Sequence, residues 1–138
     1  MFQKILLPTD GSDHSIRATE RAIELAKLYD GKIDVVYVVD GQTSKSDVLH
    51  NVSKVEIENN RKKRTNPIEE KIAQAGIDCT TQFLNGEPGP TIVDHANKED
   101  YDCVVLGSRG LNQLQTMVLG SVSHKVAKRV ECPVMIVK

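Results

Sequence analysis

Two clusters of small and polar residues have the composition and spacing of an anion-binding site. The longer cluster begins Gly107-Ser108-Arg109-Gly110 and, after nine further residues, continues Gly120-Ser121-Val122-Ser123. Glycine has no Cβ, so the backbone can turn sharply there or approach a ligand closely. Gly120-Ser121 precedes a predicted helix, whose first N–H groups and positive dipole end favour a phosphate. Ser121 and Ser123 add hydroxyl donors and Arg109 adds a positive charge. Each feature alone is typical of a turn or a helix cap, but together they favour a phosphate site.

The shorter cluster, Pro8-Thr9-Asp10-Gly11-Ser12, directly follows the first predicted strand. Asp10 has two possible roles. It could cap the first helix in competition with Ser12, or its carboxylate could face the same crevice and bind a ribose hydroxyl or a divalent ion. Ligands of open α/β sheets bind at the carboxyl ends of the strands, where the strand order reverses. We therefore expect both clusters at that edge.

Several catalytic and cofactor motifs are absent from the sequence. It contains no G-x-x-x-x-G-K-[ST] phosphate loop, no G-x-G-x-x-G after a strand and no G-x-S-x-G nucleophile elbow. The four histidines show no metal-ligand spacing, and the three cysteines form no C-x-x-C pair. Cys103, in an apolar run, is predicted to be a small buried hydrophobic residue. No general base is evident, so the sequence indicates binding more clearly than catalysis.

Short runs rich in β-branched residues predict five strands, separated by helical patterns. The strands are expected at residues 5–7, 33–39, 80–84, 102–106 and 134–137. This alternation predicts parallel pairing with right-handed crossovers and helices on both faces of the sheet. The expected fold is a doubly wound, Rossmann-like α/β domain.

The predicted helices differ in clarity. The first opens at Ser12 and stops at Gly31, the third begins after Pro90, and the fourth starts near Ser121. The second is predicted to be broken: residues 48–64 are polar and weakly periodic, and a new helix starts at Pro67. Residues 41–66 are therefore expected to be irregular. Their lysines and arginines are interleaved with acids, which favours a solvated helix face or a mobile insertion over a polyanion-binding patch. A flexible flap over a ligand is a third possibility.

Composition excludes further classes. The chain has 138 residues, with 18 Lys+Arg against 19 Asp+Glu, and an isoelectric point near 6.4. That length fits one domain, residues 1–138. The charge balance argues against a nucleic-acid binder, and no apolar run approaches the ~18 residues of a membrane span. The first residues do not resemble a signal peptide. The sequence predicts a cytoplasmic protein with neither nucleic-acid nor membrane partners.

The chain resembles the universal stress proteins of the single-domain, nucleotide-binding type over essentially its whole length. The resemblance rests on the opening Lys4-Ile5-Leu6-Leu7-Pro8-Thr9-Asp10-Gly11-Ser12, on Val38-Val39-Asp40, on Asn85-Gly86-Glu87-Pro88 and on the glycine motif. In the family that motif reads G-x₂-G-x₉-G-[S/T], and Gly107, Gly110, Gly120 and Ser121 fill it without a gap.

The resemblance implies a five-stranded parallel sheet of order 3-2-1-4-5 that binds ATP with Mg or Mn. It also implies a homodimer formed through the last strand, by Val134, Met135, Ile136 and Val137. By this resemblance the adenosine lies at Pro8, Thr9, Asp10 and Val38. The triphosphate lies on Gly107, Arg109, Gly110, Gly120, Ser121, Val122 and Ser123.

Three functions follow from these observations as hypotheses. The first is a dimeric ATP-binding protein in which the nucleotide regulates a stress response. The second is a slow ATP hydrolase or adenylate-transferring enzyme on the same scaffold, because doubly wound sheets host many chemistries. The third is a protein that acts through its dimer surface and binds no nucleotide.

Overall fold

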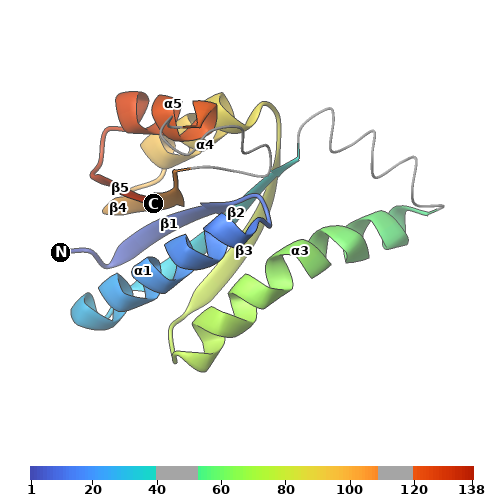
Figure 1. Ribbon diagram of the computed structural model, residues 1–138, viewed down its shortest axis with the longest axis horizontal. Coiled ribbons are helices and arrows are strands. Elements are labelled where there is room, and N and C mark those ends of the chain that lie inside the picture. The colour runs from blue at the N-terminus through green and yellow to red at the C-terminus, as the bar shows by residue number, and fades with distance from the viewer. Residues whose placement is uncertain (40–52, 109–119) are drawn as a thin grey trace.

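A computed structural model describes residues 1–39, 53–108 and 120–138, and these residues form a parallel sheet covered by helices (Figure 1). The predicted irregular segment and the glycine motif therefore lie partly outside the described residues. The strands are β1 (Lys4–Thr9), β2 (Lys32–Val39), β3 (Cys79–Asn85), β4 (Cys103–Gly107) and β5 (Val134–Val137). The described helices are α1 (Asp13–Tyr29), α3 (Lys54–Gln74), α4 (Pro88–Lys98) and α5 (Ser121–Arg129).

The sheet has the order β3-β2-β1-β4-β5 with every pair parallel. The chain moves outward from β1 to β2 and β3, and then returns to the other side of β1 for β4 and β5. The strand order therefore reverses between β1 and β4, and ligands of such sheets bind at the carboxyl side of that point. The expected doubly wound fold and its strand order are confirmed.

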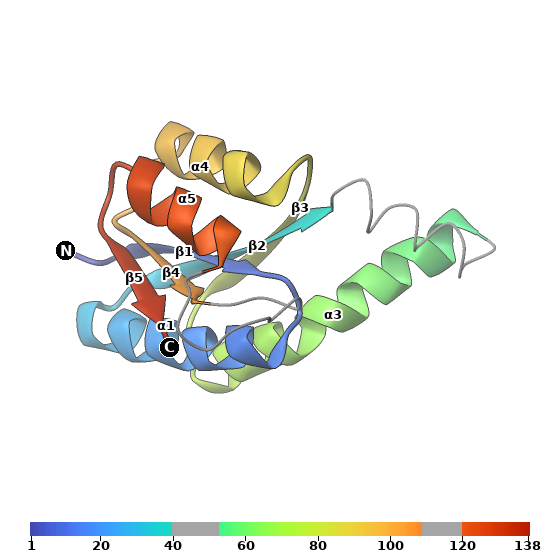
Figure 2. The same ribbon diagram turned by 45° about the horizontal axis from the view of Figure 1, so that its top comes forward.

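Two hydrophobic clusters hold the helices to the two faces of the sheet. Alternate strand residues such as Ile5, Leu7 and Val35 join Ala22 of α1 and Ile72 of α3 in one cluster. The residues between them, such as Leu6 and Val36, join α4 and α5 in the other. Figure 2 shows α1 and α3 beneath the sheet and α4 and α5 above it. Because both faces are covered, most residues of the central strands are buried, in keeping with their largely apolar runs.

The predicted break in the second helix is wrong. α3 runs from Lys54 to Gln74 with Pro67 inside it. A proline inside a helix removes one N–H and clashes with the preceding turn, but Pro67 is exposed, whereas Thr65 and Ile68 on either side of it are buried. We attribute the continuity of α3 to this packing on both sides of the proline. Residues 54–66, expected to be irregular, are therefore helical.

The third helix also starts earlier than predicted, at Pro88 instead of after Pro90. A proline suits the first turn of a helix because the N–H it lacks would have no helical acceptor there. Both prolines therefore fall within the first turn of α4. The first helix follows Ser12, as expected, and its cap residue Asp30 has a left-handed φ of 51°.

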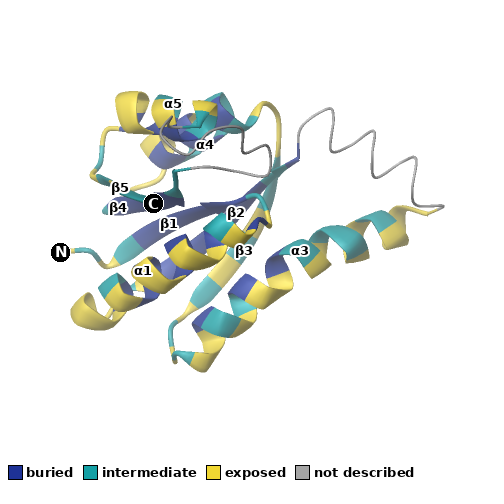
Figure 3. Ribbon diagram, in the orientation of Figure 1, coloured by how far each residue is buried: buried dark blue, intermediate teal, exposed yellow. Residues whose placement is uncertain are grey.

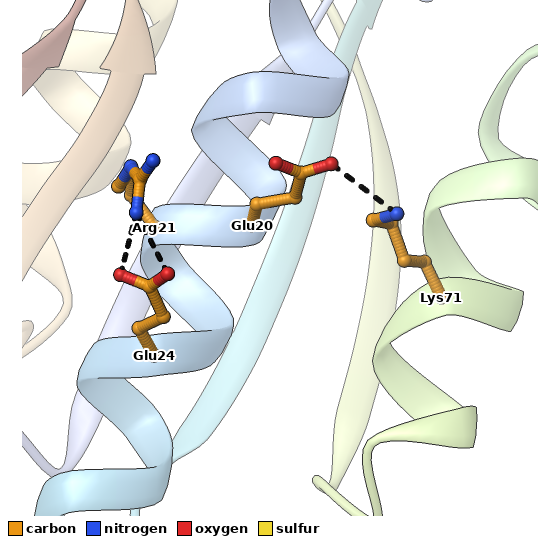
Figure 4. A network of polar contacts seen from close by, with 4 residues as sticks. All are labelled: Glu20, Arg21, Glu24 and Lys71. Atoms are coloured by element: carbon orange, nitrogen blue, oxygen red, sulfur yellow. Dashed lines mark hydrogen bonds and ion pairs between the residues drawn. The ribbon is translucent and has the colours of Figure 1, made fainter.

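An ion pair between exposed side chains links the two helices of the lower face. Nζ of Lys71 on α3 lies 3.4 Å from Oε1 of Glu20 on α1, and Arg21 pairs with Glu24 within α1 at 2.7 Å (Figure 4). Exposed pairs of this kind contribute about 0–1 kcal/mol. The hydrophobic cluster beneath them is therefore the main attachment of α3 to the domain.

Candidate functional site

The loop after β1 is held by its own side chains at the carboxyl edge of the sheet. Thr9 Oγ1 accepts a hydrogen bond from the Gly11 N–H at 3.1 Å, and Asp10 Oδ1 accepts one from the Ser12 N–H at 2.9 Å. Ser12 is the N-cap residue of α1, but its side chain makes no capping bond. Asp10 therefore orders the loop before the helix, and this half-buried residue lies at the edge where the sequence placed it.

The start of α5 is attached to the end of β4 by hydrogen bonds. The Gly120 N–H donates to the Ser108 carbonyl at 2.8 Å, and Ser123 Oγ donates to the Gly107 carbonyl at 2.6 Å. The Ser108 N–H in turn donates to the Val137 carbonyl of β5 at 2.9 Å. These contacts fix the amino end of α5 beside the carboxyl ends of β4 and β5.

The amino end of α5 has the features of an anion site. Its first helical hydrogen bond runs from the His124 N–H to the Gly120 carbonyl at 2.9 Å. The N–H groups of Ser121, Val122 and Ser123 precede that bond and have no acceptor within the helix. No acidic residue lies in the first turn, so the positive end of the helix dipole is not offset there. This end of α5 can therefore attract a phosphate.

The hydroxyl of Ser123, which the sequence suggested as a donor to a phosphate, makes a contact within the protein. Ser123 is 4% exposed, and its proton is donated to the Gly107 carbonyl. The side chain therefore connects α5 to β4, and the group that Ser123 presents at the helix end is its backbone N–H. Ser121, in contrast, is exposed.

The fold brings most of the predicted site residues to one edge. Pro8 and Thr9 end β1 and Asp10 follows them, Val38 is the second-last residue of β2, and Gly107 ends β4. β1 lies between β2 and β4, so the two clusters of the sequence flank the reversal of strand order. Arg109 and Gly110 lie outside the described residues.

One cationic residue at this edge was missed by the sequence reasoning. Arg64 of α3 donates from Nη1 to the Tyr37 hydroxyl at 2.9 Å, and its guanidinium carbon lies 6.0 Å from the Tyr37 ring centroid. Tyr37 pairs in register with Thr9, the last residue of β1. The sequence signal that could have identified Arg64 was helical spacing, because Arg64 lies four residues before Ile68. The predicted break at Pro67 concealed that spacing.

The described residues contain no group of three or more His, Cys, Asp or Glu side chains that could hold a metal ion. The thiols are also unsuited to nucleophilic chemistry, because thiolate is the reactive form. Cys103 is buried, as predicted, and burial raises its pKa to about 11. Burial likewise raises the pKa of Cys79 and Cys132. None of the described helices is long and apolar enough to cross a membrane.

Comparisons with known proteins agree with this architecture. The model of the universal stress protein family matches residues 1–138. Universal stress protein YxiE of Bacillus subtilis is 37% identical, with 100% of both chains covered. Among solved structures, universal stress protein UspA from Lactobacillus plantarum has a TM-score of 0.83 at 25% identity, covering 99% of this chain and 98% of its own.

A second solved structure, a universal stress protein in complex with cAMP, has a TM-score of 0.75 at 26% identity. The match covers 99% of this chain and 97% of that protein.

Proposed function

This chain belongs to the universal stress protein family, and we propose that it binds ATP at the carboxyl edge of its sheet as a nucleotide-dependent regulator of a stress response. The observation that carries the proposal is the amino end of α5, which follows Gly120 and opens beside β4 where the strand order reverses. The relative in complex with cAMP supports an adenine nucleotide as the ligand class.

In this proposal the triphosphate lies on the glycine motif. Gly120 and the N–H groups of Ser121, Val122 and Ser123 would hold it from α5, and Gly107 would allow close approach at the end of β4. Arg109 and Gly110, outside the described residues, would complete the motif. The adenosine would lie along Pro8, Thr9, Asp10 and Val38, with the Asp10 carboxylate able to accept a hydrogen bond from a ribose hydroxyl.

A Mg or Mn ion would accompany the phosphates. The protein alone offers no cage for it among the described residues, and Mg²⁺ is commonly held by one or two carboxylates together with substrate phosphates and water. Among the described residues, Asp10 has a carboxylate at this edge that fits such a role. The ion would neutralise phosphate charge when bound.

Calorimetric titration of the purified protein with ATP and Mg²⁺, beside a Gly120→Val variant, tests this proposal. Gly120 has φ −61° and ψ 156°, a conformation open to any residue, so the substitution tests ligand approach without backbone strain. We expect micromolar binding in the wild type and its loss in the variant, with unchanged thermal unfolding. Equal binding by both proteins would place the nucleotide elsewhere, and no binding by either would refute the proposal.

Phosphate release from the same samples separates regulation from catalysis. Phosphoryl transfer needs positioned charge and an oriented nucleophile, so we expect release far slower than ordinary enzymatic turnover. Steady release at about 1 s⁻¹ or faster, the low end of common turnover numbers, would instead support the hydrolase alternative.

We also propose that the protein is a cytoplasmic homodimer that pairs through β5. That strand forms one edge of the sheet, and an uncovered edge offers unpaired backbone groups to another chain. Its side chains are apolar throughout, and Met135 is 38% exposed. Pairing with a second copy would cover this edge.

A further inference from the structure

We propose that Arg64 of α3 is a nucleotide-binding residue that supplies a positive charge to the phosphates. It would contact them from the face of the sheet that α3 covers, whereas α5 covers the other face. The proposal rests on the nucleotide-binding function above and adds a contact from an element outside the glycine motif. A phosphate chain would then lie between a guanidinium on one side and a helix amino end on the other.

The position of Arg64 is fixed by contacts with two strand ends. A Cβ placed on Gly11 would lie 3.3 Å from the Arg64 Cβ, so the stem of the arginine packs against the loop after β1. Gly11 itself has φ +78°, a left-handed conformation that favours glycine. The guanidinium donates a hydrogen bond of 2.9 Å to the Tyr37 hydroxyl. Arg64 therefore lies at the carboxyl ends of β1 and β2.

Arg64 lies on the face of α3 that packs against the sheet. Thr65, Ile68 and Ile72 are buried against the domain, and residues three or four positions apart share a helix face. Arg64 continues that face and is half-buried, whereas its neighbours Lys62 and Lys63 are exposed. Figures 1 and 3 show that α3 continues past the end of β2. This face of α3 is therefore apolar where it covers the sheet and basic where it reaches the sheet edge.

The chemistry of this contact suits a phosphate. An arginine keeps its charge at all physiological pH values, and its planar fork matches phosphate oxygens. The Tyr37 hydroxyl accepts one of the hydrogen bonds that the guanidinium donates, and this bond orients the group. Tyr37 is itself 5% exposed, and its ring contacts Phe83 with a centroid separation of 5.8 Å. The arginine is thus held by a rigid support, as expected for a residue that positions a ligand.

Affinities of Arg64→Gln for ATP, AMP and adenosine, beside wild type and Lys63→Gln, test the proposal. Lys63 is the matched control, since it is the adjacent cation but is exposed. We expect Arg64→Gln to weaken ATP binding about tenfold or more, the loss typical of a charge-assisted hydrogen bond, and to leave adenosine within about twofold. Lys63→Gln should match the wild type. An Arg64→Lys variant, which keeps the charge and most of the stem, should have intermediate affinity for ATP.

The outcomes separate this inference from the proposed function. ATP affinity unchanged in Arg64→Gln overturns the inference and leaves nucleotide binding intact. An equal loss for ATP and adenosine also overturns it, because Arg64 would then only hold α3 against the β1 loop. Should Arg64→Gln fail to fold, Arg64→Lys decides by the same comparison of ATP with adenosine. Absence of binding in the wild type refutes the proposed function, and this inference with it.

Discussion

The hydroxyl of Tyr101 donates a hydrogen bond of 2.9 Å to Oδ2 of Asp34, joining residues 67 positions apart in the sequence. Thr80 donates to the other carboxylate oxygen at 2.6 Å, and His95 Nε2 lies 3.1 Å from the Tyr101 hydroxyl. Asp34 is 9% exposed within β2, so it depends on these partners. The network lies near the starts of β2, β3 and β4, away from the proposed nucleotide site.

Replacing Tyr101 by phenylalanine should destabilise the fold. The substitution removes the proton donated to Asp34 and leaves that buried carboxyl group with one fewer partner. We expect the free energy of unfolding to fall by about 1–3 kcal/mol, measured by urea denaturation. Tyr29→Phe is the matched control because Tyr29 is 38% exposed, and its effect should be within about 0.5 kcal/mol. Equal effects of the two substitutions would contradict this account of Asp34.

The buried hydroxyl of Tyr101 leads us to expect that the protein loses stability at alkaline pH. Burial, and then its hydrogen bond to Asp34, raise the pKa of Tyr101 above its ordinary value. The unfolded chain releases the phenolic proton above about pH 10, while the native state retains it. The contribution is therefore complete below pH 10 and declines as pH rises further. Unfolding free energies at pH 9 and pH 11 should show the wild type losing its advantage over Tyr101→Phe. A constant difference would count against the raised pKa.

Pro67→Ala should stabilise the protein. Proline inside a helix costs about 3 kcal/mol relative to alanine, partly offset because proline also restricts the unfolded chain by about 0.4–1 kcal/mol. We expect a net gain of about 2–2.6 kcal/mol in the free energy of unfolding, measured by thermal or urea denaturation. Pro88→Ala is the control, since Pro88 lies in the first turn of α4, where proline is tolerated. A destabilised Pro67→Ala variant would show that the proline has a packing role.

Met135→Lys should separate the proposed dimer into monomers. A lysine on an edge strand opposes pairing because it brings charge to the shared apolar surface. Sedimentation over a range of concentrations should give a dimer for the wild type and a monomer for the variant. Gln82→Lys is the control, because Gln82 is exposed on β3 at the opposite edge. A wild type that is monomeric at all concentrations would rule out the proposed pairing.

The order of elements was predictable because it depends on local pattern. Runs of β-branched residues defined the strands, and their alternation with helices required parallel pairing. Glycine and serine at the start of α5 predicted an anion site, because helix ends leave N–H groups without helical acceptors whatever the fold. Pro67 misled the prediction, because local propensity gives way where buried residues on both sides of a proline hold the helix together.

Contacts between distant residues were decided by the tertiary structure alone. In the sequence Arg64 is one of several charges in a polar stretch. Only the packing of α3 places its stem on Gly11 and its guanidinium at Tyr37. In the sequence Asp34 interrupts an apolar run, and only the structure shows that Thr80 and Tyr101 donate hydrogen bonds to it. Sequence by itself therefore determined the strands and their parallel pairing and predicted the edge where a ligand would bind, because both follow from short-range pattern. Which charges reach that edge, and which are hydrogen-bonded in the interior, depended on how the elements pack against one another.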